Sequence, residues 1–283
     1  MTSREALQEA SGALSRTGSA SPRLDAEILL AHCLGKDRLF LLTDPQHPLT
    51  TDEIVHYRYL IHRRLDSEPI AYIIGRKPFW SLVLDVDRRV LIPRPETELL
   101  VEEVLKILAS SGNVTPDILD VGTGSGAIAL ALAASLPRAR LTATDLSLDA
   151  LAVACGNAKK AGLAHRVAFV AADMFEPFGG TFDIVVSNPP YIAAEDYDAL
   201  PPDVRDFEPR TALWGGPRGL INYETLARDG ERVLRQGGCL CLETGSDQAQ
   251  TVSGMLRQSG AFDEIRCRRD YAGLDRVVLA RRG

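Results

Sequence analysis

The stretch DILDVGTGSGAIALALAASL, Asp117 to Leu136, is the part of the sequence that decides the fold. Its apolar start is typical of a buried strand, and its alanine- and leucine-rich end is typical of a buried helix. Between them stand Gly122, Gly124 and Gly126, and glycine is the residue that allows a positive φ angle or close approach of a ligand to the main chain. The sequence therefore predicts a strand, a tight glycine-rich loop and a helix.

The same loop fits a broader pattern. Gly122, Gly124 and Ala127 satisfy the G-x-G-x-x-G/A fingerprint of dinucleotide-binding folds. On this motif alone, a nicotinamide-dependent dehydrogenase stays open, and so does a tight turn that binds nothing.

Units of the same kind continue to the end of the chain. Strand-like and helix-like segments alternate, which predicts a mostly parallel sheet covered by helices on both faces. The last two strand-like segments have no helix between them, so we expect them to pair antiparallel at one edge. The seven expected strands are DILDVG, RLTATD, RVAFVAAD, FDIVVS, CLCLET, FDEIRCRR and RVVLA. The predicted fold class is α/β and Rossmann-like, with a mostly parallel seven-stranded sheet.

The region before this sheet has a different period. Up to Pro69 the apolar spacing is helical, and one predicted helix has Ser21 as its N-cap, Pro22 at its first position and Gly35 as its stop. Period-two segments at residues 81–87 and 89–92 then predict a hairpin. Pro95 opens another helix that ends near Gly112. These changes predict a helical domain at 1–69, a β-hairpin linker at 70–94 and an α/β domain at 95–283.

Composition excludes several classes of protein. The chain has 283 residues, 45% hydrophobic and 25% charged, with a formal net charge of −6. This charge does not favour a broad basic face for nucleic acid, so direct nucleic-acid binding is not expected. No segment approaches the length of a membrane span, and the N-terminal segment lacks the apolar centre of a signal peptide, so we expect a cytoplasmic protein.

The cysteines and histidines give no metal site. The five cysteines (Cys33, Cys155, Cys239, Cys241 and Cys267) lack the spacing of metal ligands, and we expect them to be reduced and structural. Four of the histidines (His32, His47, His56 and His62) lie in the helical region, and no cluster of cysteines or carboxylates joins them in a metal-ligand pattern. We expect no metal cofactor.

Acidic residues follow three successive strands of the predicted sheet. Asp120 precedes the glycines, Asp145 ends the next strand and Asp173 follows the third. A carboxylate in the place of Asp145 accepts hydrogen bonds from ribose hydroxyls, and one in the place of Asp173 can accept from an adenine amino group. The pattern indicates an adenosine pocket, although solvated loop carboxylates remain an alternative.

The segment NPPY, at residues 188–191, ends the strand FDIVVS. Two prolines fix φ twice and remove two backbone donors, so Asn188 is followed by a stiff segment whose carbonyls have no competing amide hydrogens nearby. The Asn188 side-chain oxygen and a rigid main-chain carbonyl suit a planar NH2 group, and Tyr191 offers a flat face for stacking. Holding both N–H bonds directs the nitrogen lone pair at an electrophile. An Asn-Pro turn without chemistry is the alternative.

These motifs together resemble a known family. DVGTGSG with Asp145 is similar to the class I S-adenosylmethionine-dependent methyltransferases, and NPPY is similar to their amino-group branch. The strings EPIAYIIGRKPFW, VLIPRPETELLVEE, FEPRTALWGG and RDYAGLDRVVLAR resemble the peptide chain release factor N5-glutamine methyltransferases. The resemblance runs over nearly the whole chain and is weakest in the first 65 residues. After NPPY, IPRPETE is its most specific part.

The resemblance implies a reaction and a partner. The expected reaction transfers a methyl group from S-adenosyl-L-methionine, giving S-adenosyl-L-homocysteine, to the side-chain amide nitrogen (N5) of the glutamine in the Gly-Gly-Gln motif of class-1 release factors. Residues 1–69 would recognise the release factor away from its reacting loop, and residues 95–283 would be catalytic.

The resemblance also implies a role for each site residue. Residues 122–126 would hold the methionine end of the cofactor, Asp145 the ribose, and Asp173 with Met174 the adenine. Asn188 and the Pro189 carbonyl would hold the glutamine amide, and Tyr191 would wall the pocket. The expected cofactor-binding residues are Gly122, Thr123, Gly124, Ser125, Gly126, Asp145, Asp173, Met174 and Asn188, and the expected catalytic residues are Asn188, Pro189, Pro190 and Tyr191.

The sequence departs from the family at two positions and leaves other functions open. Met174 stands where relatives often have an aromatic residue, and Arg218 stands where an acid is commoner. N6-adenine methylation of DNA or RNA would use NPPY in the same way, but would be expected to need basic patches, and only RYLIHRR and RCRR are dense in basic residues. Ribosomal-protein glutamine methyltransferases usually differ at IPRPETE. A non-catalytic binding module would be marked by altered motifs, and a dehydrogenase would leave NPPY unexplained.

Overall fold

The structure, a computed structural model, describes residues 1–16, 19–179 and 182–283, and its contacts divide into two units. The first unit comprises Met1–Arg76 together with Pro201–Phe207, and the second comprises Lys77–Leu200 and Glu208–Gly283. Each unit has a hydrophobic core of its own.

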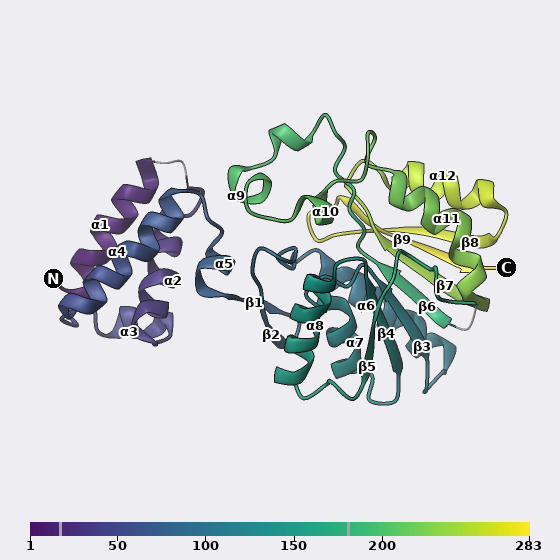
Figure 1. The fold of residues 1–283 in the computed structure, drawn as a ribbon, viewed down its shortest axis with the longest axis horizontal. Helices are drawn as coiled ribbons and strands as arrows, with labels where there is room; N and C mark the ends of the chain where they lie inside the picture. Colours follow the sequence, from purple (N-terminus) through teal and green to yellow (C-terminus); the bar gives the residue numbers. More distant parts are fainter. Residues whose placement is uncertain (17–18, 180–181) are drawn as a thin grey trace. The chain divides into compact units, whose positions relative to one another are not determined.

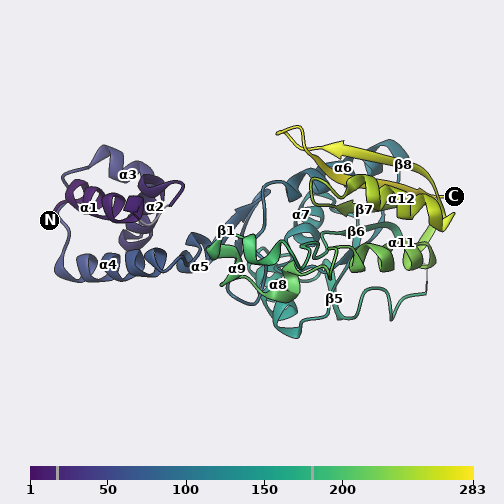
Figure 2. The same ribbon diagram turned by 90° about the horizontal axis from the view of Figure 1, so that it is seen from above.

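The first unit is helical, as its apolar spacing predicts. Its longer helices have clear end signals: Pro22 opens α2, Gly35 ends it with a φ of 61°, and Thr50 with Glu53 forms a capping box at the start of α4. Figure 2 shows α1 to α4 gathered in one bundle. The helices of this unit are α1 (Ser3–Arg16), α2 (Pro22–Leu34), α3 (Arg38–Thr43), α4 (Thr51–Leu65), α5 (Ile70–Ile74) and α9 (Pro202–Arg205).

A buried carboxylate connects the helices of this unit. Ser21 does not cap α2 with its side chain; its hydroxyl instead donates to Asp25, which is only 5% exposed. Arg64 of α4 donates from Nε to the same carboxylate over 2.9 Å. Nη1 of Arg64 also lies 3.6 Å from Asp203, which links α9 to this unit. Buried charges of this kind are stable only when they are paired.

The second unit is built on the predicted seven-stranded sheet. The strand order is β5-β4-β3-β6-β7-β9-β8. The first five strands are parallel, whereas β9 pairs antiparallel with β7 and with β8, so the expected antiparallel edge is confirmed. The strands are β3 (Asp117–Val121), β4 (Arg140–Asp145), β5 (Val167–Ala171), β6 (Phe182–Ser187), β7 (Leu234–Glu243), β8 (Phe262–Arg269) and β9 (Asp275–Arg282).

Helices cover both faces of the sheet, as Figure 1 shows. Neighbouring strand residues point to opposite faces, so Ile118 packs with α6, α7 and α8 while Leu119 packs with α11 and α12. Burial on both sides explains why the strands read as nearly continuous apolar runs. The helices of this unit are α6 (Thr97–Ser111), α7 (Ala127–Ser135), α8 (Leu148–Lys160), α10 (Arg210–Leu213), α11 (Ile221–Val233) and α12 (Ala249–Ser259), with a 3₁₀ helix at Tyr197–Ala199.

The predicted hairpin is present, but one of its strands was assigned wrongly. The two-stranded sheet pairs β1 (Arg76–Phe79) with β2 (Leu82–Asp85), whereas residues 89–92 form no strand. Pro78 inside β1 concealed that strand, and Trp80 makes the tight turn with a positive φ of 56°. A turn in which the amide of Val90 donates to the carbonyl of Asp87 then ends the extended backbone. The segment after β2 therefore does not belong to the two-stranded sheet, and residues 89–91 line the cavity described below.

Several sequence-level expectations concern what the chain lacks. Within residues 1–16, 19–179 and 182–283, no helix is both long and apolar enough to cross a membrane. In the same ranges, no three histidine, cysteine or acidic side chains are grouped so that they could hold a metal ion. The cysteines are free thiols, and Cys241 in β7 is fully buried.

Candidate active site

A cavity of about 380 Å³ lies in the second unit, where β3, β4, β5 and β6 end. The chain passes from β3 outward to β5 and then returns to place β6 on the other side of β3. Ligands of open α/β sheets bind at such a reversal of strand order, and the volume suits a small molecule. The predicted site residues that line the cavity are Gly122, Gly124, Asp145, Asp173, Met174, Asn188, Pro189 and Pro190.

The glycine loop presents bare backbone to this cavity. The amides of Gly122 and Thr123 donate to the carbonyl of Thr144 over 2.9 and 2.8 Å, which joins the loop to the end of β4. Gly122 and Gly124 have φ angles of 74° and 56°, and a Cβ atom at either would meet no atom within 4 Å. The space that these side chains would fill is left for a ligand against the main chain.

Two acidic residues stand at the cavity in different surroundings. Asp145 accepts hydrogen bonds from the amides of Gly124 and Ser147, both over 2.9 Å, so this carboxylate also holds the loop in place. Asp173 is exposed at the end of β5. Met174 beside it is partly buried and has a positive φ of 48°, a conformation that is strained for a residue with a side chain.

The remaining residues of the glycine motif face the interior instead of the cavity. Thr123 donates from its hydroxyl to Asp120 over 2.6 Å, and the amide of Ala129 donates to the same carboxylate oxygen over 3.1 Å. Thr123 and Ser125 are 6% and 3% exposed. Gly126 packs close to α8, where a Cβ would lie 3.2 Å from that of Ala154. These residues stabilise the loop through contacts on its interior side.

Asp120 is the most strongly perturbed acid of the site. It is fully buried, and its Oδ1 atom has no hydrogen-bond partner among the described residues. Burial raises the pKa of Asp120 to about 7, and the nearby charge of Asp145 acts in the same direction. The hydrogen bond from Thr123 opposes this rise.

The NPPY segment supplies the opposite wall. Asn188 follows β6 and donates from Nδ2 to the hydroxyl oxygen of Thr97 over 3.2 Å. No donor in the described part of the chain reaches Oδ1 of Asn188 or the carbonyl of Pro189. The next two carbonyls are occupied, because Nδ2 of Asn222 donates to Pro190 over 2.7 Å and Nε2 of Gln248 donates to Tyr191 over 2.9 Å. The acceptors left available at this wall are therefore those of Asn188 and Pro189.

Tyr191 is held behind this wall. It is partly buried against the hydrophobic cluster that includes Leu220 and Tyr223, and it is absent from the cavity lining. Burial raises the pKa of Tyr191, and the charge of Glu243 adds to that effect. The stacking role predicted for Tyr191 stays a prediction.

A glycine-containing loop presses on the backbone of NPPY. The amide of Ile192 donates to Leu213, and the amide of Gly215 donates to Ile192, both over 2.9 Å. A Cβ atom on Gly219 would lie 2.2 Å from the carbonyl oxygen of Tyr191. The sequence WGGPRGL therefore supports NPPY through close backbone contact, and Arg218 points away to pair with Glu224 over 3.2 Å.

Sequence reasoning missed more than half of the lining. Residues 89–91 were assigned to a strand, and Arg89 at the cavity is paired with Asp87 over 2.6 Å. Asn222 carried no sequence signal, because it stands inside an ordinary helical pattern. The parallel arrangement of the strands could have indicated the residues beside each strand end. The missed residues are Arg89, Val90, Leu91, Val121, Thr144, Leu146, Ser147, Ala150, Ala172, Ser187, Pro209, Thr211, Ala212 and Asn222.

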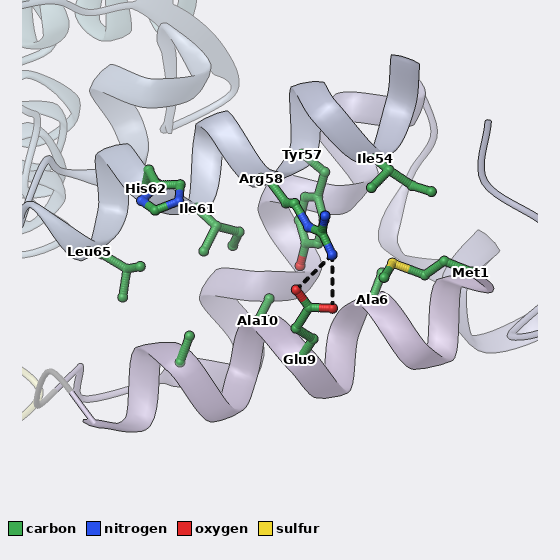
Figure 3. Close-up of a pocket in the computed structure, with 11 residues that line it drawn as sticks. Met1, Ala6, Glu9, Ala10, Ile54, Tyr57, Arg58, Ile61, His62 and Leu65 are labelled. Atoms are coloured by element: carbon green, nitrogen blue, oxygen red, sulfur yellow. Dashed lines mark hydrogen bonds and ion pairs between the residues drawn. The ribbon is translucent and has the colours of Figure 1, made fainter. Parts of the chain in front are cut away.

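A second cavity of about 230 Å³ lies in the first unit, between α1 and α4. Figure 3 shows Tyr57, Ile61 and Leu65 of α4 opposite the small side chains of α1, with Arg58 paired to Glu9 across it. The Arg58–Glu9 distance is 3.1 Å, and both side chains are more than half exposed. The residues that line this cavity include no glycine.

Comparisons with known proteins match both regions. Residues 5–75 match a family model described as the PrmC N-terminal domain, and residues 95–200 match one described as the Methyltransferase small domain. A release factor glutamine methyltransferase from Moorella thermoacetica is 46% identical over 283 residues, which cover 100% of this chain and 99% of that protein. One from Chlorobaculum tepidum is 46% identical over 263 residues, with coverage of 90% and 88%.

One solved structure of low sequence identity has a similar fold. A methyltransferase from Pyrococcus furiosus matches with a TM-score of 0.53 and 16% sequence identity, covering 72% of this chain and 90% of that one. At this identity the likeness shows the fold alone, and it agrees with the α/β class predicted from the sequence.

The pKa of Asp120 predicts a pH-dependent stability. Because burial raises this pKa from 3.8 to about 7, the folded protein binds a proton that the unfolded chain has released between these values. The contribution of protonated Asp120 to the free energy of unfolding is fully present below about pH 4 and is lost as the pH rises through about 7. We expect Asp120→Asn to reduce the fall in the free energy of unfolding between pH 5 and 8 by roughly 1–4 kcal/mol.

Urea denaturation at several pH values measures this effect. The exposed Asp173→Asn variant is the control and should leave the pH dependence as it is in the wild type. An identical pH dependence in Asp120→Asn and the wild type would contradict the assignment.

The contact at Gly219 predicts a stability loss beyond the usual effect of its φ angle. Gly219 and Gly273 have φ angles of 70° and 81°, but a Cβ on Gly273 would meet no atom within 4 Å. We expect Gly273→Ala to lower the free energy of unfolding by about 1–2 kcal/mol. Gly219→Ala should lower it by more than about 3 kcal/mol, because a backbone carbonyl must also move. Equal losses in denaturant titrations would show that the NPPY backbone is not tightly held.

Proposed function

The chain belongs to the release factor glutamine methyltransferase family, and from this premise we propose which residues carry out the reaction. The family resemblance predicted from NPPY and IPRPETE is thereby confirmed. The protein is an enzyme that methylates a glutamine of a peptide chain release factor, and its relatives do not favour the alternative of adenine methylation. We propose that the target is the amide nitrogen of the glutamine in the Gly-Gly-Gln motif of class-1 release factors.

The residues at the cavity suit S-adenosylmethionine as the methyl donor. Gly122 and Gly124 leave their backbone open to a ligand, and we propose that this loop holds the methionine end. Asp145 and Asp173 stand at the ends of neighbouring strands, where they can accept hydrogen bonds from ribose hydroxyls and an adenine amino group. S-adenosylmethionine supplies a methyl group on a positively charged sulfur, so no further electrophile is needed. The expectation that no metal takes part stays a prediction.

The single observation that supports this proposal is the pair of free acceptors at the NPPY wall. Oδ1 of Asn188 and the carbonyl of Pro189 can each accept one N–H bond of a planar amide, while the neighbouring carbonyls are occupied by Asn222 and Gln248. An amide nitrogen held in this way keeps its lone pair free.

The same two acceptors favour the transition state over the ground state. As the nitrogen forms a bond to the methyl carbon, it gains positive charge and its N–H groups become stronger donors. Oδ1 of Asn188 and the Pro189 carbonyl are fixed before the reaction, so their interaction strengthens without reorganisation. The nitrogen then releases one proton. A strong base is not required, since the alkylated amide is acidic.

The helical region offers a surface for the protein substrate. Leu39, Leu42, Val55 and Tyr59 of α3 and α4 are each 59–65% exposed, so this unit presents apolar side chains to a partner. We propose that residues 1–69 bind the release factor away from its glutamine loop. Release factors act in the cytoplasm, and we propose that this enzyme acts there as well, without a nucleic-acid partner.

Mass spectrometry of a class-1 release factor after incubation with the enzyme and S-adenosylmethionine tests the function. We expect one added methyl group on the glutamine of the Gly-Gly-Gln loop, and none on a release factor in which that glutamine is replaced by alanine. Equal methylation of the replaced release factor would refute the proposed target.

The role of Asn188 has a separate test. Asn188→Ala should reduce the rate of methyl transfer by at least about 100-fold, because it removes one of the two acceptors of the amide. The affinity for S-adenosylmethionine, measured by isothermal titration, should change by less than about threefold. Full activity in this variant would exclude the assigned role.

A further inference from the structure

Two buried residues next to the acceptor pair have no role in the mechanism described so far. Thr97 is the first residue of α6 and belongs to IPRPETE, and Glu243 is the last residue of β7. They are 4% and 1% exposed. β6 and β7 lie side by side (Figure 1), and Ser187 of β6 pairs with Leu242 of β7. Glu243 is one residue beyond Leu242, and Asn188 is one residue beyond Ser187.

Hydrogen bonds connect these residues to Asn188. Nδ2 of Asn188 donates to the hydroxyl oxygen of Thr97 over 3.2 Å. The Thr97 hydroxyl acts on the buried Glu243 carboxylate as a donor and lowers its pKa. The other carboxylate oxygen of Glu243, Oε2, is buried without a partner among the described residues. The three side chains therefore form a short chain that ends on an acid.

These interactions run in one direction, from the Asn188 amide through the Thr97 hydroxyl to the Glu243 carboxylate. An ionised carboxylate can only accept hydrogen bonds, so Glu243 takes the single hydroxyl hydrogen of Thr97. The Thr97 oxygen then has only lone pairs to offer on its other side. Of the two ends of the Asn188 amide, only the NH2 group can bond to a lone pair, and the oxygen must point the other way.

We propose that Thr97 and Glu243 are positioning residues that fix the orientation of the Asn188 side-chain amide, so that its oxygen and not its NH2 group is offered to the substrate. This inference rests on the proposed function, in which that oxygen accepts a hydrogen bond from the glutamine amide. An inverted Asn188 would present donors to a group that itself has only donors to offer.

The protonation state of Glu243 controls the orientation of the Asn188 amide. Burial raises the pKa of Glu243 to about 7, while Thr97, Arg276 and Arg94 act against the rise and Glu96 acts with it. Tyr191 and Tyr223 also lie near this carboxylate. A protonated Glu243 can donate to Thr97, whose own hydrogen is then free to bond to the oxygen of Asn188. The orientation of the amide is fixed only while Glu243 is ionised.

Substitutions at Thr97 test the proposal. Thr97→Val keeps the shape but leaves the Asn188 NH2 group unpaired, which favours the inverted amide; we expect kcat to fall by about 10- to 100-fold. Thr97→Ser restores the hydroxyl and should stay within about threefold of the wild type. The matched control is Thr244→Val, because Thr244 is also buried, lies next to Glu243 and donates outside the site to the carbonyl of Arg276.

The outcomes separate this inference from the proposed function. The assay measures methyl transfer to a release factor, together with the Kd for S-adenosylmethionine, which should not change in Thr97→Val. Wild-type enzyme that methylates no release factor would refute the proposed function. Active wild type with a Thr97→Val variant of equal kcat would refute only the positioning role, as would a Thr97→Ser variant as weak as Thr97→Val.

Glu243→Gln provides a second test that does not depend on how Thr97→Val folds. The wild-type kcat should fall as the pH is lowered through about 7, because protonated Glu243 no longer fixes the amide. In Glu243→Gln this acid limb should be absent, and kcat above pH 8 should be lower than that of the wild type. An acid limb that is unchanged in Glu243→Gln would overturn the proposal.

Discussion

Parallel pairing of β3 with a strand on each side is the constraint on which the rest of the site depends. Because β4, β3 and β6 run in one direction, their carboxyl ends meet at one edge of the sheet. The glycine loop, Asp145 and Asn188 then lie around a single cavity although they are far apart in the sequence. Helices that cover both faces of the sheet leave this edge as the place where polar groups can meet a ligand.

Two carboxylates near this edge of the sheet are buried. Asp120 lies in β3 just before the glycine loop, and Glu243 is the last residue of β7. Burial raises the pKa of each to about 7. Thr123 donates to Asp120, and Thr97 lowers the pKa of Glu243. Asp120 accepts from the hydroxyl of Thr123 in the glycine loop, and Glu243 lies next to the Thr97 side chain to which Asn188 donates.

The NPPY segment is rigid for two independent reasons. Its prolines restrict φ and cannot donate hydrogen bonds, which is a property of the sequence. Its later carbonyls are also bound by Asn222 and Gln248, and WGGPRGL packs directly against its backbone, which is a property of the tertiary structure. Together they fix the positions of the two remaining acceptors, Oδ1 of Asn188 and the carbonyl of Pro189.

The sequence by itself determined the order of the sheet's strands along the chain, their alternation with helices, and the antiparallel edge. It also determined the positions of the glycine loop and NPPY, because apolar periodicity, glycine and proline act locally. It misplaced one strand of the hairpin, since Pro78 hides β1 and residues 89–92 alternate without pairing. Only the tertiary structure decided that Thr123 and Ser125 face the interior, that Asn222 donates to the backbone of NPPY, and that Thr97 reaches Asn188. The hydrogen bond between Thr97 and Asn188 joins residues 91 positions apart, and no local pattern encodes which side chains will meet when strands from different parts of the chain end at one edge.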